Sequence, residues 1–168
     1  RLIIHIRNLI ISIKWIFNSY IKFKNHLEGR GYYALSLSKI WLWKEDSKYF
    51  TVYNTDGNCF FVKMKTEKSV LYEYKLLSYI SSKNISKDRF YPEIVETNTT
   101  GFIYNIYKNI NGRKMSRSSF KISFIDQMRR ILVFLKEHKI IHRDIRPHNI
   151  LLDHNNIILL DFEHCIMN

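Results

Sequence analysis

The residues of this chain that are best suited to chemistry lie close together near its C-terminal end. Asp144 and Asn149 precede one short apolar run, Ile150–Leu152, and Asp161 follows a second, Ile157–Leu160. A polar Asp-His-Asn-Asn segment separates the two runs, and such punctuation between β-formers predicts a hairpin. Three side chains that can bind a metal ion or accept a proton would therefore lie at the two ends of one hairpin.

The segment 142–163 carries the pattern H-R-D-x-x-x-x-N followed by D-F-x, and it resembles the protein-kinase-like superfamily of phosphotransferases. The resemblance implies transfer of the γ-phosphate of ATP to a hydroxyl, with Mg²⁺ as cofactor. By resemblance, Asp161 and Asn149 would bind Mg²⁺ through hard oxygen ligands. Asp144 would accept the proton of the attacking hydroxyl, and Arg146 would steady the γ-phosphate.

Residues 32–64 are expected to form a sheet. The turn sequence Asn-Thr-Asp-Gly between two aromatic-rich runs is a hairpin signal. The segment FFVK, residues 60–63, is similar to the V-A-I-K of the same superfamily, which implies that Lys63 binds phosphate. The predicted strands are Ser36–Trp43, Lys48–Tyr53 and Cys59–Met64.

The next segment, Thr66–Ser82, is predicted to be a helix with Thr66 as its N-cap. Val70, Leu77 and Ile80 form an apolar stripe, and Glu73 falls on it. An acid on an apolar face needs a cation, and the superfamily supplies a strand lysine. We therefore predict an ion pair between Lys63 and Glu73 in the nucleotide-binding part of the site.

Two further strands, Tyr91–Glu96 and Gly101–Ile110, are expected around a polar turn. By resemblance, the second runs into the hinge, where the backbone of Lys108, Asn109 and Ile110 would meet adenine. A helix is then predicted over Ser119–His138. The residues expected to face inward on it are Phe124, Ile125, Met128, Ile131, Leu132 and Leu135.

Residues 1–24 are rich in isoleucine but contain no uncharged run long enough to predict a transmembrane helix. Ile6, Ile10, Ile13 and Phe17 follow helical spacing. We favour a helix that packs against the domain through this stripe. The alternative is a helix lying on an anionic membrane surface, which its basic flank and an embedded tryptophan also suit.

Three departures from the superfamily pattern bear on function. The expected loop between the first two strands, Lys44–Lys48, has no glycine, so the glycine-rich phosphate loop is missing. Phe61 replaces the alanine of V-A-I-K, where it would crowd the adenine pocket. Few residues follow Asp161, so we expect the C-lobe to be minimal or truncated. The predicted fold is α+β and protein-kinase-like with two lobes and a minimal or truncated C-lobe. We expect divisions at 1–31 (N-terminal amphipathic helix), 32–112 (N-lobe) and 113–168 (partial C-lobe).

The acceptor is predicted from residues around the motif. Glu163 in place of the D-F-G glycine resembles small-molecule and lipopolysaccharide kinases, so an envelope-sugar hydroxyl is the first expectation. His-Arg-Asp and the pair Arg146-Pro147 instead favour a protein Ser/Thr kinase. The missing glycine loop and Phe61 favour a third alternative, a non-catalytic pseudokinase that binds nucleotide or a partner.

The composition limits the partners. The 168 residues carry a net charge of +12, which favours anionic partners such as nucleotide phosphates and lipid head groups. No nucleic-acid recognition motif is present, so nucleic acid is not expected. Cys59 and Cys165 lack the spacing of a metal site. We expect a cytoplasmic protein; peripheral contact at the inner face of the membrane is the alternative that the N-terminal segment leaves open.

Overall fold

The computed structural model describes residues 2–84, 89–115 and 121–167, which form two compact units. Unit 1 comprises Arg1–Tyr74 and Ile94–Asn109, and unit 2 comprises Lys75–Glu93 and Ile110–Asn168. Helix α2 (Glu67–Lys83) contributes residues to both units. The domain boundaries expected from the sequence stay a prediction.

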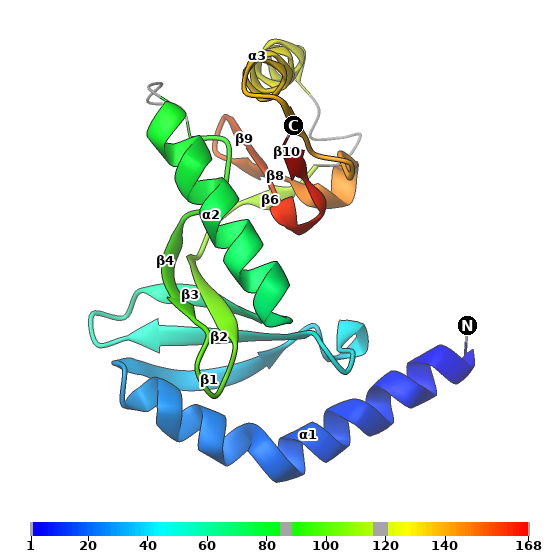
Figure 1. Cartoon of the computed structure of the whole chain (residues 1–168), viewed down its shortest axis with the longest axis vertical. Helices are drawn as coiled ribbons and strands as arrows, with labels where there is room; N and C mark the ends of the chain where they lie inside the picture. Colours follow the sequence, from blue (N-terminus) through cyan, green and yellow to red (C-terminus); the bar gives the residue numbers. More distant parts are fainter. Residues whose placement is uncertain (1, 85–88, 116–120, 168) are drawn as a thin grey trace. The chain divides into compact units, whose positions relative to one another are not determined.

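Unit 1 is built on a five-stranded antiparallel sheet of order β1-β2-β3-β5-β4 (Figure 1). The register pairs Lys63 with Tyr49 on one side and with Asn105 on the other. Because side chains alternate along a strand, these three lie on one face of the sheet. The strands are β1 (Tyr32–Ser38), β2 (Lys48–Asn54), β3 (Cys59–Met64), β4 (Ile94–Asn98) and β5 (Tyr104–Lys108).

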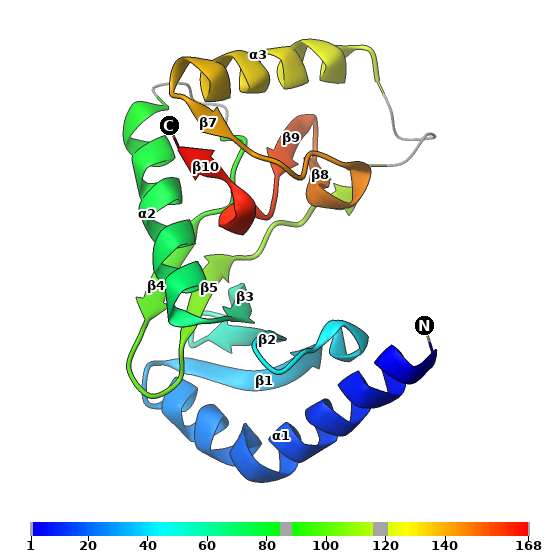
Figure 2. The same cartoon turned by 45° about the vertical axis from the view of Figure 1, so that its right-hand side comes forward.

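The opposite face of the sheet is apolar and packs against α1 (Leu2–Glu28), which runs alongside β1 in both views (Figures 1 and 2). Phe23 and Leu27 of α1 are fully buried in this core. The Phe23 ring lies 5.0 Å from that of Phe50 on β2, and Trp15 lies 5.6 Å from Trp43, centroid to centroid. Aromatic pairs at these separations add to the stability that burial provides.

The predicted packing of the N-terminal helix is correct, but the face was wrong. Ile6, Ile10, Ile13 and Phe17 are 50%, 60%, 46% and 84% exposed. Spacing shows that they share a side of the helix, and a different side carries Phe23 into the core. None of the described helices is long and apolar enough to cross a membrane.

The first strand also differs from its predicted range of Ser36–Trp43, since β1 begins at Tyr32 and ends at Ser38. Lys39 has a left-handed backbone, with φ of 50°, and the chain then forms a short 3₁₀ helix, η1 (Ile40–Leu42). The turn buries Trp43, whose indole N–H donates to the Ser38 carbonyl at 2.8 Å. A buried indole needs such an acceptor, so the turn replaces the end of the strand.

Unit 2 contains the predicted hairpin, β8 (Ile150–Asp153) and β9 (Asn156–Leu159), with Ile150 opposite Leu159. Strand β6 (Arg113–Lys114) pairs with β8 to complete a three-stranded sheet. A second, two-stranded sheet joins β7 (Ile140–Ile141) to β10 (Ile166–Met167).

Helix α3 (Ser123–Glu137) occupies most of the predicted range Ser119–His138, of which residues 119 and 120 lie outside the described part. Phe124, Ile131 and Leu135 are buried as predicted. Ile125 and Leu132 are about half exposed, which corrects their predicted inward orientation. They line an apolar groove of about 690 Å³, which Ile145 and Pro147 of the following loop also border.

The two phenylalanines of α1 test how the helix is held. Phe23→Ala should lower the free energy of unfolding by about 3–5 kcal/mol, because it leaves a cavity in the core of unit 1. Phe17→Ala should change it by less than about 0.5 kcal/mol, because Phe17 is 84% exposed. Urea denaturation followed by circular dichroism measures both values. Equal effects of the two substitutions would contradict this packing.

Candidate active site

Lys63 and Glu73 form the predicted ion pair within unit 1. The Lys63 Nζ lies 3.1 Å from Glu73 Oε2, and the two side chains are 9% and 3% exposed. Strand β3 supplies the lysine, and α2 carries the glutamate one turn after its first residues. The amide of Ser69 donates to Thr66 Oγ1 at 3.4 Å, in agreement with the predicted N-cap. A buried charge pair of this kind needs further hydrogen bonds to offset its desolvation.

Tyr107 on β5 supplies one of those hydrogen bonds, and the sequence did not predict it. Its phenol donates to Glu73 Oε2 at 2.8 Å. Burial, followed by the neighbouring Glu73 carboxylate, raises the pKa of Tyr107 well above its ordinary value, so the group stays a donor. Asn105, on the same face of β5, donates to the Val70 carbonyl of α2 at 3.1 Å. The β3–β5 register, once known, would have pointed to both residues.

Removing the Tyr107 hydroxyl should loosen this cluster. Tyr107→Phe should lower the free energy of unfolding by about 1.5–3 kcal/mol, because a buried charged acceptor loses a donor. Tyr53→Phe is the control, since Tyr53 is 41% exposed and should lose almost nothing. Urea denaturation compares the two variants. Similar losses in both would show that the hydroxyl does not stabilise Glu73.

In unit 2, two side chains converge on Asp144. Arg146 Nη2 lies 3.1 Å from Asp144 Oδ2, and Asn149 Nδ2 donates to the same oxygen at 2.7 Å. Asn149 Nδ2 also donates to the Asp144 carbonyl at 3.0 Å. No described residue donates a hydrogen bond to Oδ1. The catalytic-loop residues predicted from the motif are therefore together, and one carboxylate oxygen remains available to a hydroxyl.

The hairpin explains why Asn149 and Asp161 lie near each other. The amide of Leu160 donates to the Asn149 carbonyl at 2.8 Å, just beyond the last pair of the hairpin, and Asp161 follows. Asp161 has a left-handed backbone with φ of 67°. Such strain is found at functional sites when the surroundings enforce it.

These two residues suit Mg²⁺ as part of a nucleotide complex. Asn149 uses its amide nitrogen on Asp144, which leaves Oδ1 as the ligand atom, and Asp161 offers a carboxylate. No group of three or more His, Cys, Asp or Glu side chains gathers as a metal site within the described ranges. Mg²⁺ commonly binds one or two protein oxygens together with phosphates and water. The donor set fits that mode and does not provide an all-protein cage.

His142 joins the catalytic loop to the residues after the hairpin, and its role was missed in the sequence. The ring is buried, and Asp144 donates its backbone N–H to Nδ1 at 3.3 Å. Nε2 must then carry the proton, and it donates to the Leu160 carbonyl at 3.0 Å. The centroid of the His142 ring lies 4.8 Å from that of Phe162, and the two rings are arranged edge to face. Burial lowers the pKa of His142, although Asp161 and Asp144 act in the opposite direction.

The lowered pKa of His142 gives a pH dependence with a definite sign. The unfolded chain binds a proton near pH 6.5, whereas the folded unit binds it only at lower pH. Stability is therefore retained above pH 6.5 and falls as the pH drops through and below that value. Urea denaturation at several pH values should show this slope, and His142→Gln should reduce it. An unchanged slope in His142→Gln would contradict the assignment.

The predicted adenine contacts remain a prediction. Lys108 is the last residue of β5, and the Asn109 amide donates to the Cys59 carbonyl at 3.3 Å, within the sheet. Ile110 is the first residue of its segment in unit 2. Of the three predicted hinge groups, the Asn109 N–H is thus already engaged by the protein.

The loop without glycine is closed by its own contacts. Lys44 and Ser47 form an isolated β-bridge, in which the Ser47 amide donates to the Lys44 carbonyl at 3.3 Å. The Lys48 ammonium donates to the carbonyls of Lys44 and Glu45 at 3.3 and 2.8 Å. Burial lowers the pKa of Lys48, with Asp46 and Glu45 acting in the opposite direction. The Ser47 amide is therefore engaged within the loop itself.

Phe61 lies on the same sheet face as Lys63, as the strand alternation predicts. Its ring stacks on Tyr49 at 6.0 Å, and the Lys39 ammonium lies 5.0 Å from the Phe61 centroid. This face of unit 1 therefore carries an aromatic pair beside the buried lysine. The expectation that Phe61 crowds the adenine pocket stays a prediction.

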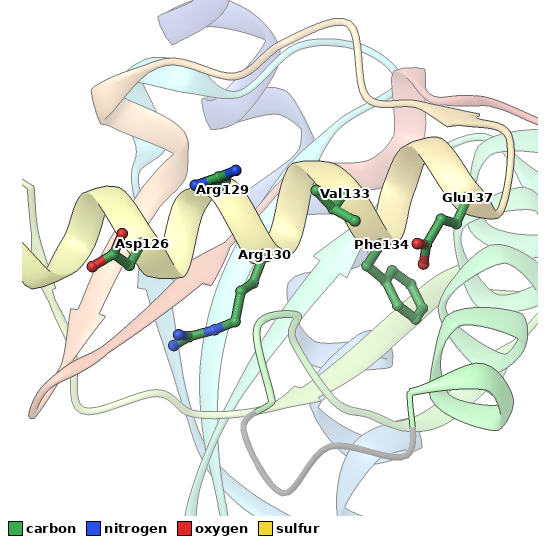
Figure 3. Close-up of a pocket in the computed structure, with 6 residues that line it drawn as sticks. All are labelled: Asp126, Arg129, Arg130, Val133, Phe134 and Glu137. Carbon is green, nitrogen blue, oxygen red and sulfur yellow. The ribbon is translucent and has the colours of Figure 1, made fainter.

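A surface hollow of about 440 Å³ runs along one side of α3 and contains none of the predicted site residues (Figure 3). Two arginines, two acids and two apolar residues line it, so its charges offset one another. These are Asp126, Arg129, Arg130, Val133, Phe134 and Glu137. Nothing in this arrangement resembles a catalytic group, and the hollow is not part of the candidate site.

Comparison with curated proteins finds relatives among protein kinases. The chain is 37% identical over 83 residues to the dual specificity protein kinase zak2 of Dictyostelium discoideum, which covers 48% of the chain and 13% of that protein. It is 32% identical over 101 residues to the serine/threonine-protein kinase CAK1 of Saccharomyces cerevisiae, covering 60% and 27%. An aurora kinase of Yarrowia lipolytica is 34% identical over 105 residues, covering 58% and 27%. The chain thus spans between 13% and 27% of these relatives.

Comparison with solved structures establishes the fold. The Rio2 kinase of Chaetomium thermophilum, solved as an ADP/Mg²⁺-phosphoaspartate complex, matches with a TM-score of 0.65 and 14% identity. The match covers 88% of this chain and 53% of that one. The chain has the protein-kinase-like α+β fold, as predicted. A scan against protein families finds no match. The expected likeness to lipopolysaccharide kinases finds no support among these relatives.

Proposed function

We propose that this chain is the nucleotide- and metal-binding part of an ATP- and Mg²⁺-dependent protein kinase that transfers the γ-phosphate to a serine or threonine hydroxyl. The observation that carries the proposal is the arrangement of Asp144. Asn149 and Arg146 hold one of its carboxylate oxygens, while no described residue donates to the other. A carboxylate fixed in this way is placed to orient a hydroxyl and accept its proton.

Each remaining residue has a role consistent with its surroundings. Mg²⁺ would neutralise the charge of the phosphates, and Asp161 and Asn149 would hold it. Lys63, fixed by Glu73 at 3.1 Å, would contact the phosphates without having to be ordered on binding. Arg146 is 58% exposed beside Asp144, so its guanidinium could shift towards a γ-phosphate. The backbone of residues 108–110 would contact adenine.

A protein acceptor is better supported than an envelope sugar. Of the matched relatives, zak2 is named as a dual specificity protein kinase and CAK1 as a serine/threonine-protein kinase. The argument for a sugar rested on Glu163, together with the basic charge and the amphipathic N-terminal segment. The Glu163 carboxylate lies 3.3 Å from His164 Nε2, which is a local contact that does not bear on the acceptor.

Substitution of Asp144 tests the proposal. Phosphate transfer from γ-labelled ATP to a generic basic protein should be Mg²⁺-dependent and should fall about 10²–10⁴-fold in Asp144→Asn, the range of a lost general base. Asp153→Asn is the matched control, because Asp153 lies in the turn of the same hairpin and should keep the rate. An unchanged rate in Asp144→Asn would refute the role of Asp144. Transfer to lipopolysaccharide but not to protein would restore the sugar acceptor.

A second candidate function, that of a non-catalytic nucleotide-binding pseudokinase, is favoured by Phe61. Its ring stacks on Tyr49 and lies under the Lys39 ammonium, on the face where Lys63 would meet the nucleotide. In this case ATP with Mg²⁺ should raise the melting temperature while no phosphate is transferred. If ATP neither raises the melting temperature nor serves as phosphate donor, both candidate functions are wrong.

A further inference from the structure

The exposed side of α1 is an apolar surface that has no place in the candidate site. Five large apolar side chains follow one another at helical spacing along it. We call this set the outer stripe of α1; it comprises Ile6, Ile10, Ile13, Phe17 and Ile21. Its members are between 46% and 84% exposed. At 1.5 Å per residue, the stripe is about 22 Å long.

The outer stripe is exposed in a helix that is already anchored. Phe23 and Leu27 are fully buried, and Trp15 contacts both Trp43 and Phe50. Tyr20 donates its hydroxyl to the Leu35 carbonyl at 2.9 Å. The helix cannot turn the stripe towards the sheet without breaking these contacts. The stripe must therefore be covered by something outside unit 1, or remain in water.

The charges around the outer stripe of α1 indicate which kind of surface can cover it. Residues 1–27 contain five lysines and arginines and no aspartate or glutamate. Arg7, Lys14 and Lys22 are exposed on the helix. Two copies packed stripe to stripe would bring these cations together, and Glu28, the acid at the end of α1, already pairs with Lys24 at 3.6 Å. An anionic surface, in contrast, offers both an apolar layer and counter-charges.

We propose that α1 lies on an anionic membrane surface, with the outer stripe in the acyl boundary and Arg7, Lys14 and Lys22 beside acidic head groups. An amphipathic helix of this kind combines burial of apolar area with attraction to anionic lipid. The opposite side of the same helix stays in the core of unit 1, so binding needs no rearrangement of the sheet. The contact is peripheral, in keeping with a helix that does not qualify as a membrane span.

Vesicle sedimentation tests this inference on the whole chain. Phosphatidylcholine vesicles that contain phosphatidylglycerol should retain the protein, and vesicles of phosphatidylcholine alone should not. The combined variant Ile13→Ser and Phe17→Ser should weaken retention by at least about tenfold, because two exposed apolar anchors are lost. Ile122→Ser is the matched control, because Ile122 is 81% exposed outside α1 and should not affect retention.

A second pair of substitutions separates charge from apolar contact. Lys14→Gln with Lys22→Gln should weaken binding to the anionic vesicles by about thirtyfold, because each basic residue near such a surface contributes roughly fivefold. Added salt should weaken binding of the unaltered chain in the same direction. Circular dichroism confirms that each variant is folded.

Three results would overturn the proposal. The first is equal retention by neutral and anionic vesicles, and the second is no retention by either. The third is a dimer in light scattering that Ile13→Ser with Phe17→Ser converts to a monomer, since a second copy would then cover the stripe. Phosphate transfer plays no part in these measurements, so their outcome is independent of the proposed kinase activity.

Discussion

The buried pair of Lys63 and Glu73 is the constraint on which the arrangement of unit 1 depends. A single buried charge would cost several kcal/mol, so neither residue could remain there without the other. The pair links strand β3 to helix α2, and the phenol of Tyr107 adds a link to β5. Three elements thus meet at one carboxylate oxygen. Their side chains are fixed before any ligand binds, which is the condition under which a charged group assists catalysis most.

In unit 2, hydrogen bonds to backbone groups hold the candidate site residues in place. The catalytic loop has little regular structure of its own, so its polar groups need partners elsewhere. His142 and Asn149 provide them by bonding to the two backbone groups of Leu160. The loop and the residues after the hairpin are therefore held as one piece, and Asp144 takes its position from Asn149. His142, for which we propose no chemical role, thus helps to place the loop residues to which the proposal assigns one.

Much of this could be predicted from the sequence, because the relevant signals are local. The hairpin was marked by its polar turn, β3 was predicted with its observed bounds, and an acid on the apolar side of α2 required a cation. The helical period of the N-terminal segment was equally clear. What it could not show was which side faces the sheet, since α1 is apolar on more than one side. The inner side is set by Phe23 and Trp15, whose partners Phe50 and Trp43 come later in the chain.

The same limit explains the other misses. Tyr107 and His142 act through contacts with residues 34 and 18 positions away, and no local pattern reveals such pairs. Ile125 and Leu132 of α3 follow the apolar period, yet they border a groove instead of the core. The end of β1 at Ser38 depends on the burial of a single indole. For Tyr107 and His142 the deciding partner is distant in sequence, and for α3 the apolar pattern allows more than one side.

The sequence separation between hydrogen-bonded residues also has a consequence for the order in which the protein folds. The links around His142 and Asn149 close loops of 18 residues or fewer, whereas the Tyr107–Glu73 link closes one of 34. Loop closure becomes slower and entropically more costly as the intervening chain lengthens. We expect the β8–β9 hairpin to assemble early and by itself. Lys63 would gain its full set of partners only after β5 has joined the sheet.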